Sequence, residues 1–142
     1  IMELVRKEAD LKENYDLLTS IKGIGMINSI LVLIFTNNFT LFSDARKFGC
    51  YCGVVPFEYT SGKSIRGKPH VHFMANKQLK QLLHMCALTA CIHDPEMQTY
   101  FKRKVTEGKS KMLVINNIRN KMIHRICACV RENRKFETRL VA

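Results

Sequence analysis

The sequence predicts an all-α domain that contains one irregular segment. Apolar residues recur at helical spacing along most of the chain, and residues that cap helices precede several of these stretches. The 142 residues suit one domain, and the 46% hydrophobic content supports a buried core. Only residues 54–73 lack the helical pattern, and their glycine, proline and aromatic residues predict a loop or a short β-hairpin.

The first expected element is a helix over residues 2–18, in which apolar residues alternate with charges of both signs. We interpret residues 1–18 as the end of a helical linker or coiled coil, and residues 19–142 as the domain proper. Because the chain begins with an isoleucine and not with methionine, we expect a fragment of a longer protein. A second helix is expected after a tight turn that contains Gly23 and Gly25.

Capping residues predict where the later helices begin. Ser43 is the expected N-cap of a short helix, Asp94 with Pro95 starts another, and the last helix begins near Ser110. We expect the Asn and Arg residues of the last helix on its wetter side. The apolar stripe of that helix, which we expect to face the core, consists of Ile115, Ile118, Met122, Ile126 and Cys129.

The formal net charge of +11 indicates a polyanionic partner, of which nucleic acid is the commonest. The alternative is a basic surface that has no ligand, and charge alone does not separate DNA from RNA or from an acidic membrane. The longest apolar run, from Ile30 to Phe35, is far shorter than a membrane span. No secretory signal is visible, so we expect a cytoplasmic protein without a membrane partner.

Six cysteines are present, four of them in two Cys-x-Cys pairs. Zinc ligation is one interpretation, since His70 and His72 are nearby. On a helix, however, positions two apart point about 200° away from each other, so neither pair there chelates one ion. We therefore expect reduced and partly buried thiols.

Residues 17–30 are interpreted as a helix–hairpin–helix motif. Its turn, which contains Gly23 and Gly25, would present backbone N–H groups at the start of the second helix. These donors suit a DNA phosphate, and Lys22 adds a cation at the same edge. The alternative is a helical hairpin that only packs against the domain.

A second candidate site lies in the irregular segment. Ser61 stands beside Gly62, and Lys63, Arg66 and Lys68 follow closely. An exposed serine hydroxyl among cations is the arrangement that phosphoryl transfer through a serine nucleophile requires. No general base is evident, and the alternative is a basic loop that only grips phosphates.

Several motifs that carry a family resemblance follow one another in order. They are Ile21-Lys22-Gly23-Ile24-Gly25, Ser43-x-x-Arg46-Lys47-Phe48, Gly53-Val54-Val55-Pro56, Ser61-Gly62, Ala75-Asn76-x-x-Leu79-Lys80, Tyr100 and Gly108-Lys109. In this order and spacing the chain resembles the C-terminal transposase domain of DEDD-type insertion-sequence transposases, the relatives of the Piv and MooV invertases. Within them it is similar to versions common in gut Bacteroidetes. The resemblance spans about residues 17–136.

This resemblance implies a DNA strand cleavage and transfer function in which Ser61 matches the serine nucleophile of the family. It also implies a coiled coil and an N-terminal RuvC-like domain whose four acidic ligands bind Mg²⁺, so no cofactor is expected in this fragment. The implied partners are double-stranded DNA, a structured guide RNA and further copies of the chain, in a bacterial cytoplasm. The fragment alone is expected to be inactive.

The chain departs from the family at residues 72–76, where relatives carry Ser-Lys-x-Gly-Asn, and at Lys80, where they carry arginine. Lysine keeps the charge but lacks the bidentate fork of arginine. The alternatives are a non-catalytic helix–hairpin–helix module that binds nucleic acid, and a protein-assembly module. The residues that we expect to contact phosphate are Lys22, Gly23, Gly25, Lys63, Arg66, Lys68, Asn76 and Lys80.

Overall fold

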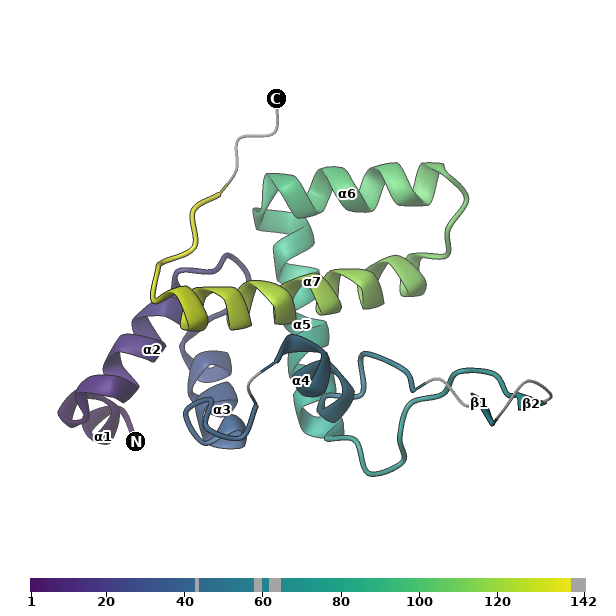
Figure 1. Ribbon diagram of the computed structural model, residues 1–142. Coiled ribbons are helices and arrows are strands. Elements are labelled where there is room, and N and C mark those ends of the chain that lie inside the picture. Colours follow the sequence, from purple (N-terminus) through teal and green to yellow (C-terminus); the bar gives the residue numbers. More distant parts are fainter. Residues whose placement is uncertain (43, 58–59, 62–64, 139–142) are drawn as a thin grey trace.

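Seven helices and one pair of short strands make up the described residues of the computed structural model (Figure 1), which are 1–42, 44–57, 60–61 and 65–138. The helices are α1 (Met2–Lys7), α2 (Ala9–Thr19), α3 (Met26–Thr36), α4 (Ala45–Tyr51), α5 (Lys77–His93), α6 (Pro95–Thr106) and α7 (Lys111–Glu132). The antiparallel strands are β1 (Thr60–Ser61) and β2 (Ile65–Arg66). The predicted all-α class is confirmed, and these strands lie in the segment for which the sequence predicts a loop or short hairpin.

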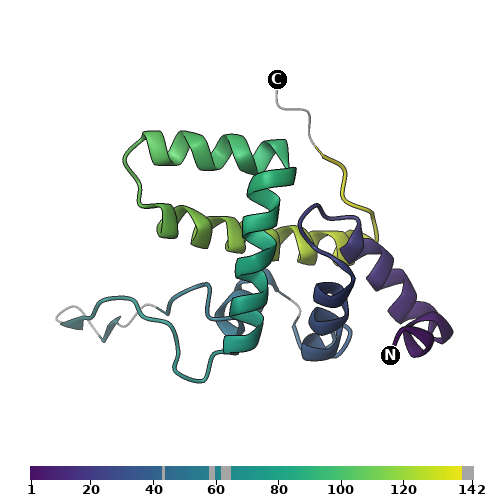
Figure 2. The ribbon, with the colours of Figure 1, turned by 180° about the vertical axis from the view of Figure 1, so that it is seen from behind.

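Helices α5 and α7 cross at the centre of the domain, as both ribbon views show (Figures 1 and 2). Helix α7 also packs against α2, α4 and α6, while α3 and α6 pack against α5. The stripe predicted for α7 is buried along its whole length. Each large aliphatic side chain removed from water in this way contributes about 1.5–3 kcal/mol to stability. The buried stripe of α5 consists of Leu79, Leu82, Leu83, Cys86, Ala87 and Ala90.

Side chains cap the N-termini of the four helices α4 to α7. Asp94 caps α6 and Ser110 caps α7 by accepting hydrogen bonds from backbone N–H groups two and three residues on, as the sequence predicts. Asn76 caps α5 in the same manner. The prediction of Ser43 as the cap of α4 is wrong. Asp44 holds this position, because its carboxylate accepts a hydrogen bond at 2.7 Å and suits the positive end of the helix; Ser43 lies outside the described residues.

The prediction of a single helix over residues 2–18 is also wrong, because the helical segment is divided at Glu8. The backbone of Glu8 is extended (φ −92°, ψ 112°), which ends the hydrogen-bond ladder of α1 and begins that of α2. Val5 of α1 is buried, as are Leu17 and Leu18 at the end of α2. The last turn of α2 is therefore part of the core, and the domain boundary drawn after residue 18 stays a prediction.

Arg119 of α7 corrects the expectation that the arginines of this helix lie on its wetter side. Its side chain is 6% exposed. The guanidinium donates to Nδ1 of His84 on α5 at 2.7 Å and to Oδ1 of Asn116 at 3.4 Å. Because these partners lie between the crossing helices, Arg119 turns inward at a position where the apolar pattern alone predicts solvent.

Candidate nucleic-acid interface

Residues 54–76, here called the arm, leave the helical body between α4 and α5 and carry the two strands at their far end (Figure 1). In the strand pair Ser61 stands opposite Ile65. Nearer the body, Phe57 and His70 exchange two backbone hydrogen bonds, at 3.0 and 3.3 Å. Antiparallel pairing thus joins the two sides of the arm at its far end and at Phe57, and it fixes the register of Ser61 opposite Ile65.

Beyond its base, the arm carries three of the predicted site residues that the structure describes. Ser61 belongs to β1 and Arg66 to β2, and Lys68 follows on the returning side, where it is exposed. Lys63 lies outside the described residues. Among the residues 55–57 and 67–76, whose burial the structure describes, none belongs to the buried core.

Asn76, which the sequence predicts as a phosphate contact, closes the base of the arm. Its backbone N–H donates to the carbonyl of Tyr51 at 2.8 Å, and its side-chain amide donates to the Tyr51 hydroxyl at 3.2 Å. Its side-chain oxygen accepts a hydrogen bond from the N–H of Leu79 and so caps α5. The hydrogen bonds of Asn76 therefore connect α4 to the start of α5.

Gly53 makes the close approach at this base possible. Its φ of +66° is in the left-handed region, and an added Cβ would lie 2.9 Å from the Cβ of Ala75 and 3.1 Å from Val71. The aliphatic stem of Lys80 lies 3.6 Å from the same point. Lys80 is therefore half-buried against the base of the arm, with its stem covering backbone.

The two glycines of the predicted helix–hairpin–helix turn have different surroundings. Gly23 (φ +98°) packs against α5, where a Cβ would lie 2.8 Å from the carbonyl oxygen of Cys86 and 3.1 Å from Ala90. Gly25 precedes α3 and is open, since a Cβ there would meet no atom within 4 Å. Lys22, which follows the buried Ile21, is exposed. Gly23 thus serves packing inside the fold, and only Gly25 and Lys22 face outward.

The start of α3 has no side-chain cap, and the first two side chains of that helix, Met26 and Ile27, are exposed. This turn and the arm do not form one site. The arm meets α5 at Asn76, whereas the turn packs near Ala90, so about 20 Å of helix separates them at 1.5 Å per residue.

A cluster of exposed aromatic rings at the base of the arm was not among the predicted site residues. The rings of His72 and Phe73 are stacked with centroids 4.7 Å apart, and Phe57 meets His72 edge-on at 5.9 Å. The signal in the sequence is the apolar run that follows His72, which stands outside any helical stripe.

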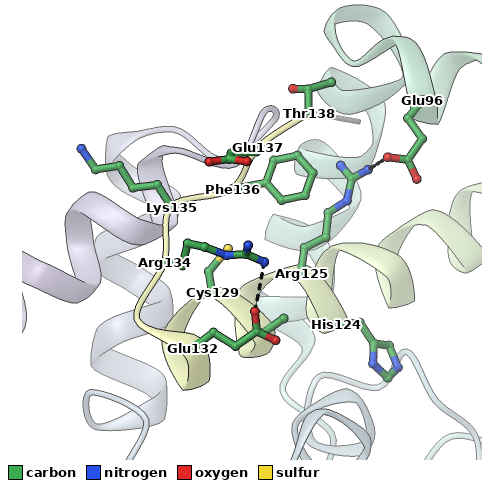
Figure 3. A pocket seen from close by; sticks show the side chains of 11 residues that line it. Glu96, His124, Arg125, Cys129, Glu132, Arg134, Lys135, Phe136, Glu137 and Thr138 are labelled. Carbon is green, nitrogen blue, oxygen red and sulfur yellow. Dashed lines mark hydrogen bonds and ion pairs between the residues drawn. The ribbon is translucent and has the colours of Figure 1, made fainter. Parts of the chain in front are cut away.

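A pocket at the C-terminal end of α7 carries charges that are already paired (Figure 3). Arg125 forms ion pairs with Asp94 and Glu96, and its guanidinium lies 4.3 Å from the ring centroid of Phe136. The N–H of Phe136 donates to the hydroxyl of Ser20 at 2.8 Å. These contacts fasten the C-terminal segment across α7 to the end of α2, and the paired guanidinium of Arg125 is poorly placed to bind an anion.

The six cysteines are free. Burial raises the pKa of Cys86 to about 11 and that of Cys127 to about 11, so both thiols are protonated at neutral pH. Within residues 1–42, 44–57, 60–61 and 65–138, no three His, Cys, Asp or Glu side chains are grouped so that they could hold a metal ion. No described helix combines the length and apolar character that a membrane span needs.

Comparison with known proteins shows that more than half of the chain matches a known protein family. Residues 15–102 match the family described as "Transposase IS116/IS110/IS902 family". The chain is 29% identical over 141 residues to a pilin gene-inverting protein of Moraxella bovis, which covers 99% of this chain and 44% of that protein. It is 29% identical over 125 residues to an uncharacterized 43.6 kDa protein of insertion element IS110 from Streptomyces coelicolor, covering 88% of this chain and 31% of that protein. The chain thus spans less than half the length of these relatives.

Proposed function

Because this chain belongs to the transposase IS116/IS110/IS902 family, we propose that it is the domain that binds DNA and supplies a serine nucleophile for strand cleavage and transfer. The nucleophile is Ser61. The observation that carries this proposal is the place of Ser61 in a strand pair at the far end of the arm (Figure 1), within a segment that also contains Lys63, Arg66 and Lys68.

In the proposed step the hydroxyl oxygen of Ser61 attacks a DNA phosphorus. A serine–phosphorus bond forms, one bridging P–O bond of the strand breaks, and the serine proton goes by way of solvent to the sugar oxygen that leaves. The cations of the arm stabilise the additional negative charge of the transition state. Attack by a second strand end on the serine–phosphate bond reverses this chemistry, rejoins the DNA and frees the hydroxyl.

The turn before α3 holds the duplex in this proposal. The backbone N–H groups that follow Gly25 have no side-chain cap, and the absence of a Cβ at Gly25 leaves room for a phosphate. Lys22 adds an exposed charge beside them. Contacts of this kind read no base sequence, so they position the duplex and leave site selection to other parts of the protein.

The finer features of the resemblance are also proposals: a DEDD-type acidic domain that binds Mg²⁺, a structured guide RNA, and assembly with further copies of the chain. The described residues contain no cluster that fits Mg²⁺, so we assign no step of this chain to the metal. What this chain contributes is the serine, the surrounding cations and the grip on the backbone.

The test compares Ser61→Ala with Ser64→Ala in the protein that carries the proposed acidic domain. Both substitutions remove one hydroxyl from the same loop. We expect a protein–DNA adduct that survives denaturant for the parent and for Ser64→Ala, and loss of the adduct and of recombination for Ser61→Ala, by at least about 1,000-fold. Undiminished recombination by Ser61→Ala would show that the serine is not the nucleophile and would favour a domain that only grips DNA.

A further inference from the structure

The arm leaves the helical body beside α4 (Figure 1). Residues of α4 and of the arm line an open pocket of about 660 Å³. One wall is helical and includes Arg46, Lys47 and Tyr51. The other wall belongs to the arm and includes Phe57 and His72. Most of the surface that lines the pocket is apolar, although it lies outside the hydrophobic core.

The apolar side chains around this pocket are unusually open to solvent. Phe73 is 83% exposed, Met74 is 72% exposed and Phe57 is 47% exposed. The ring of His72 contacts both phenyl rings, so Phe57, His72 and Phe73 form one continuous aromatic cluster. Exposed apolar side chains gathered in this way mark a surface that another molecule covers.

The charges beside the pocket indicate the chemistry of that molecule. Arg46 and Lys47 are exposed and form no ion pair with any described residue. The one carboxylate in the lining, Asp44, accepts a hydrogen bond from the backbone of Arg46 as the cap of α4. Unpaired cations at the edge of exposed rings match a strand whose phosphates are charged and whose bases stack on aromatic faces.

The occupant must be an unpaired base, because the bases of a duplex are covered on both faces by their neighbours. The pocket is also close to the proposed nucleophile. Phe57 and Ser61 are four residues apart, so the chain between them spans at most about 14 Å. This distance corresponds to roughly two nucleotides of an extended single strand. A base held in the pocket would therefore place a phosphate near Ser61.

We propose that this pocket binds an unstacked base of single-stranded DNA, with Arg46 and Lys47 on the phosphates. The stacking surface consists of Phe57 and His72, which line the pocket, and of Phe73, whose ring stacks on His72 beside it. The proposal rests on the proposed function for its location beside the serine. It adds that the domain recognises an unpaired strand, which exists only when the duplex is opened or cut. The pocket holds the strand in place and does not take part in bond breaking.

The test measures reversible binding of this chain to a short single-stranded oligothymidine that carries one 2-aminopurine, a base whose fluorescence falls when it stacks. The variants are Phe73→Ala and Phe73→Leu, and the leucine keeps the apolar bulk while removing the aromatic face. Ile92→Ala, another exposed apolar side chain on the far end of α5, is the control. Phe73 is mostly exposed, so its substitution leaves the core intact.

We expect quenching on binding to the single strand, little quenching with the same sequence as a duplex, and about tenfold weaker binding for both Phe73 variants but not for Ile92→Ala. Binding by Phe73→Leu equal to that of the parent would overturn the stacking role. Tighter binding of the matching RNA would overturn the assignment to DNA. Because the readout involves no covalent step, adduct formation at Ser61 and base stacking at Phe73 succeed or fail separately.

Discussion

At the scale of single residues, the pair formed by Arg119 and His84 is the least expected feature of the core. Arginine has no hydrogen-bond acceptor, so Nδ1 of His84 must accept the bond of 2.7 Å and the ring proton must be on Nε2. Partial burial and the charge of Arg119 lower the pKa of His84 below its ordinary value of 6.5. Neither side chain contacts a carboxylate of the described residues, so the folded chain favours neutral His84.

This pair predicts a loss of stability in mild acid. The unfolded chain takes up a proton at His84 near pH 6.5, whereas the folded chain takes it up only at lower pH. The unfolded state therefore binds more protons in this window, and the free energy of unfolding falls as the pH drops below about 6.5. His84→Gln, whose side chain keeps an acceptor for Arg119, should remove this contribution.

The measurement is urea unfolding of the parent and of His84→Gln on both sides of pH 6.5. The other histidines titrate in both proteins, so only the difference between the two curves reports on His84. Parallel curves over the whole range would contradict the assignment of the lowered pKa.

At the scale of elements, the two glycines of the turn between α2 and α3 have different roles, since Gly23 packs against α5 and Gly25 is open to solvent. Gly23→Ala should destabilise the fold by at least about 1–2 kcal/mol, because alanine is strained at φ +98° and its Cβ would lie 2.8 Å from a carbonyl of α5. Gly25→Ala should leave the melting temperature nearly unchanged, since its Cβ meets nothing, and should weaken DNA binding. Thermal unfolding and a binding titration of both variants separate these roles. Equal destabilisation by the two substitutions would contradict the packing described for Gly23.

Helix caps and apolar stripes are the elements that the sequence predicts best. Asp94 with Pro95 is a local signal that is complete within a few residues, and the stripes of α5 and α7 depend only on helical periodicity. The break at Glu8 has no such signal, because neither glycine nor proline marks it. The inward turn of Arg119 depends on His84, which is far away in the sequence. The hydrogen bond by which Asn76 joins α5 to α4 likewise depends on the distant Tyr51.

The same distinction applies to the candidate site. Local composition identifies Ser61 with its neighbouring cations and the turn at Gly25 as separate features. The distance between them depends on how the turn and the arm pack on α5, which no local pattern contains. The edge-on contact between Phe57 and His72 likewise depends on pairing between the two sides of the arm, since these residues are 15 positions apart in the sequence.

At the scale of the whole molecule, two of the cations that we expect to contact phosphate lie on widely separated parts of the fold. The turn with Lys22 and the arm with Lys68 are attached near opposite ends of α5, about 20 Å apart along its axis. At 3.4 Å per base pair, this separation corresponds to roughly six base pairs of duplex. A single duplex that follows this face would therefore meet the two lysines at different phosphates.

This arrangement predicts how binding depends on salt. If each lysine neutralises its own phosphate, the slope of log K against log salt should become shallower by about 0.9 for Lys22→Ala, by about 0.9 for Lys68→Ala, and by about 1.8 for the double variant. Lys102→Ala, an exposed lysine on α6, is the matched control and should leave the slope unchanged. The measurement is a fluorescence anisotropy titration of a labelled duplex at several salt concentrations.

A double variant with the slope of either single one would mean that the two lysines share one phosphate, which the separation along α5 does not permit. Binding with almost no salt dependence would instead identify an apolar assembly surface, in which case the charge of +11 would serve no polyanion.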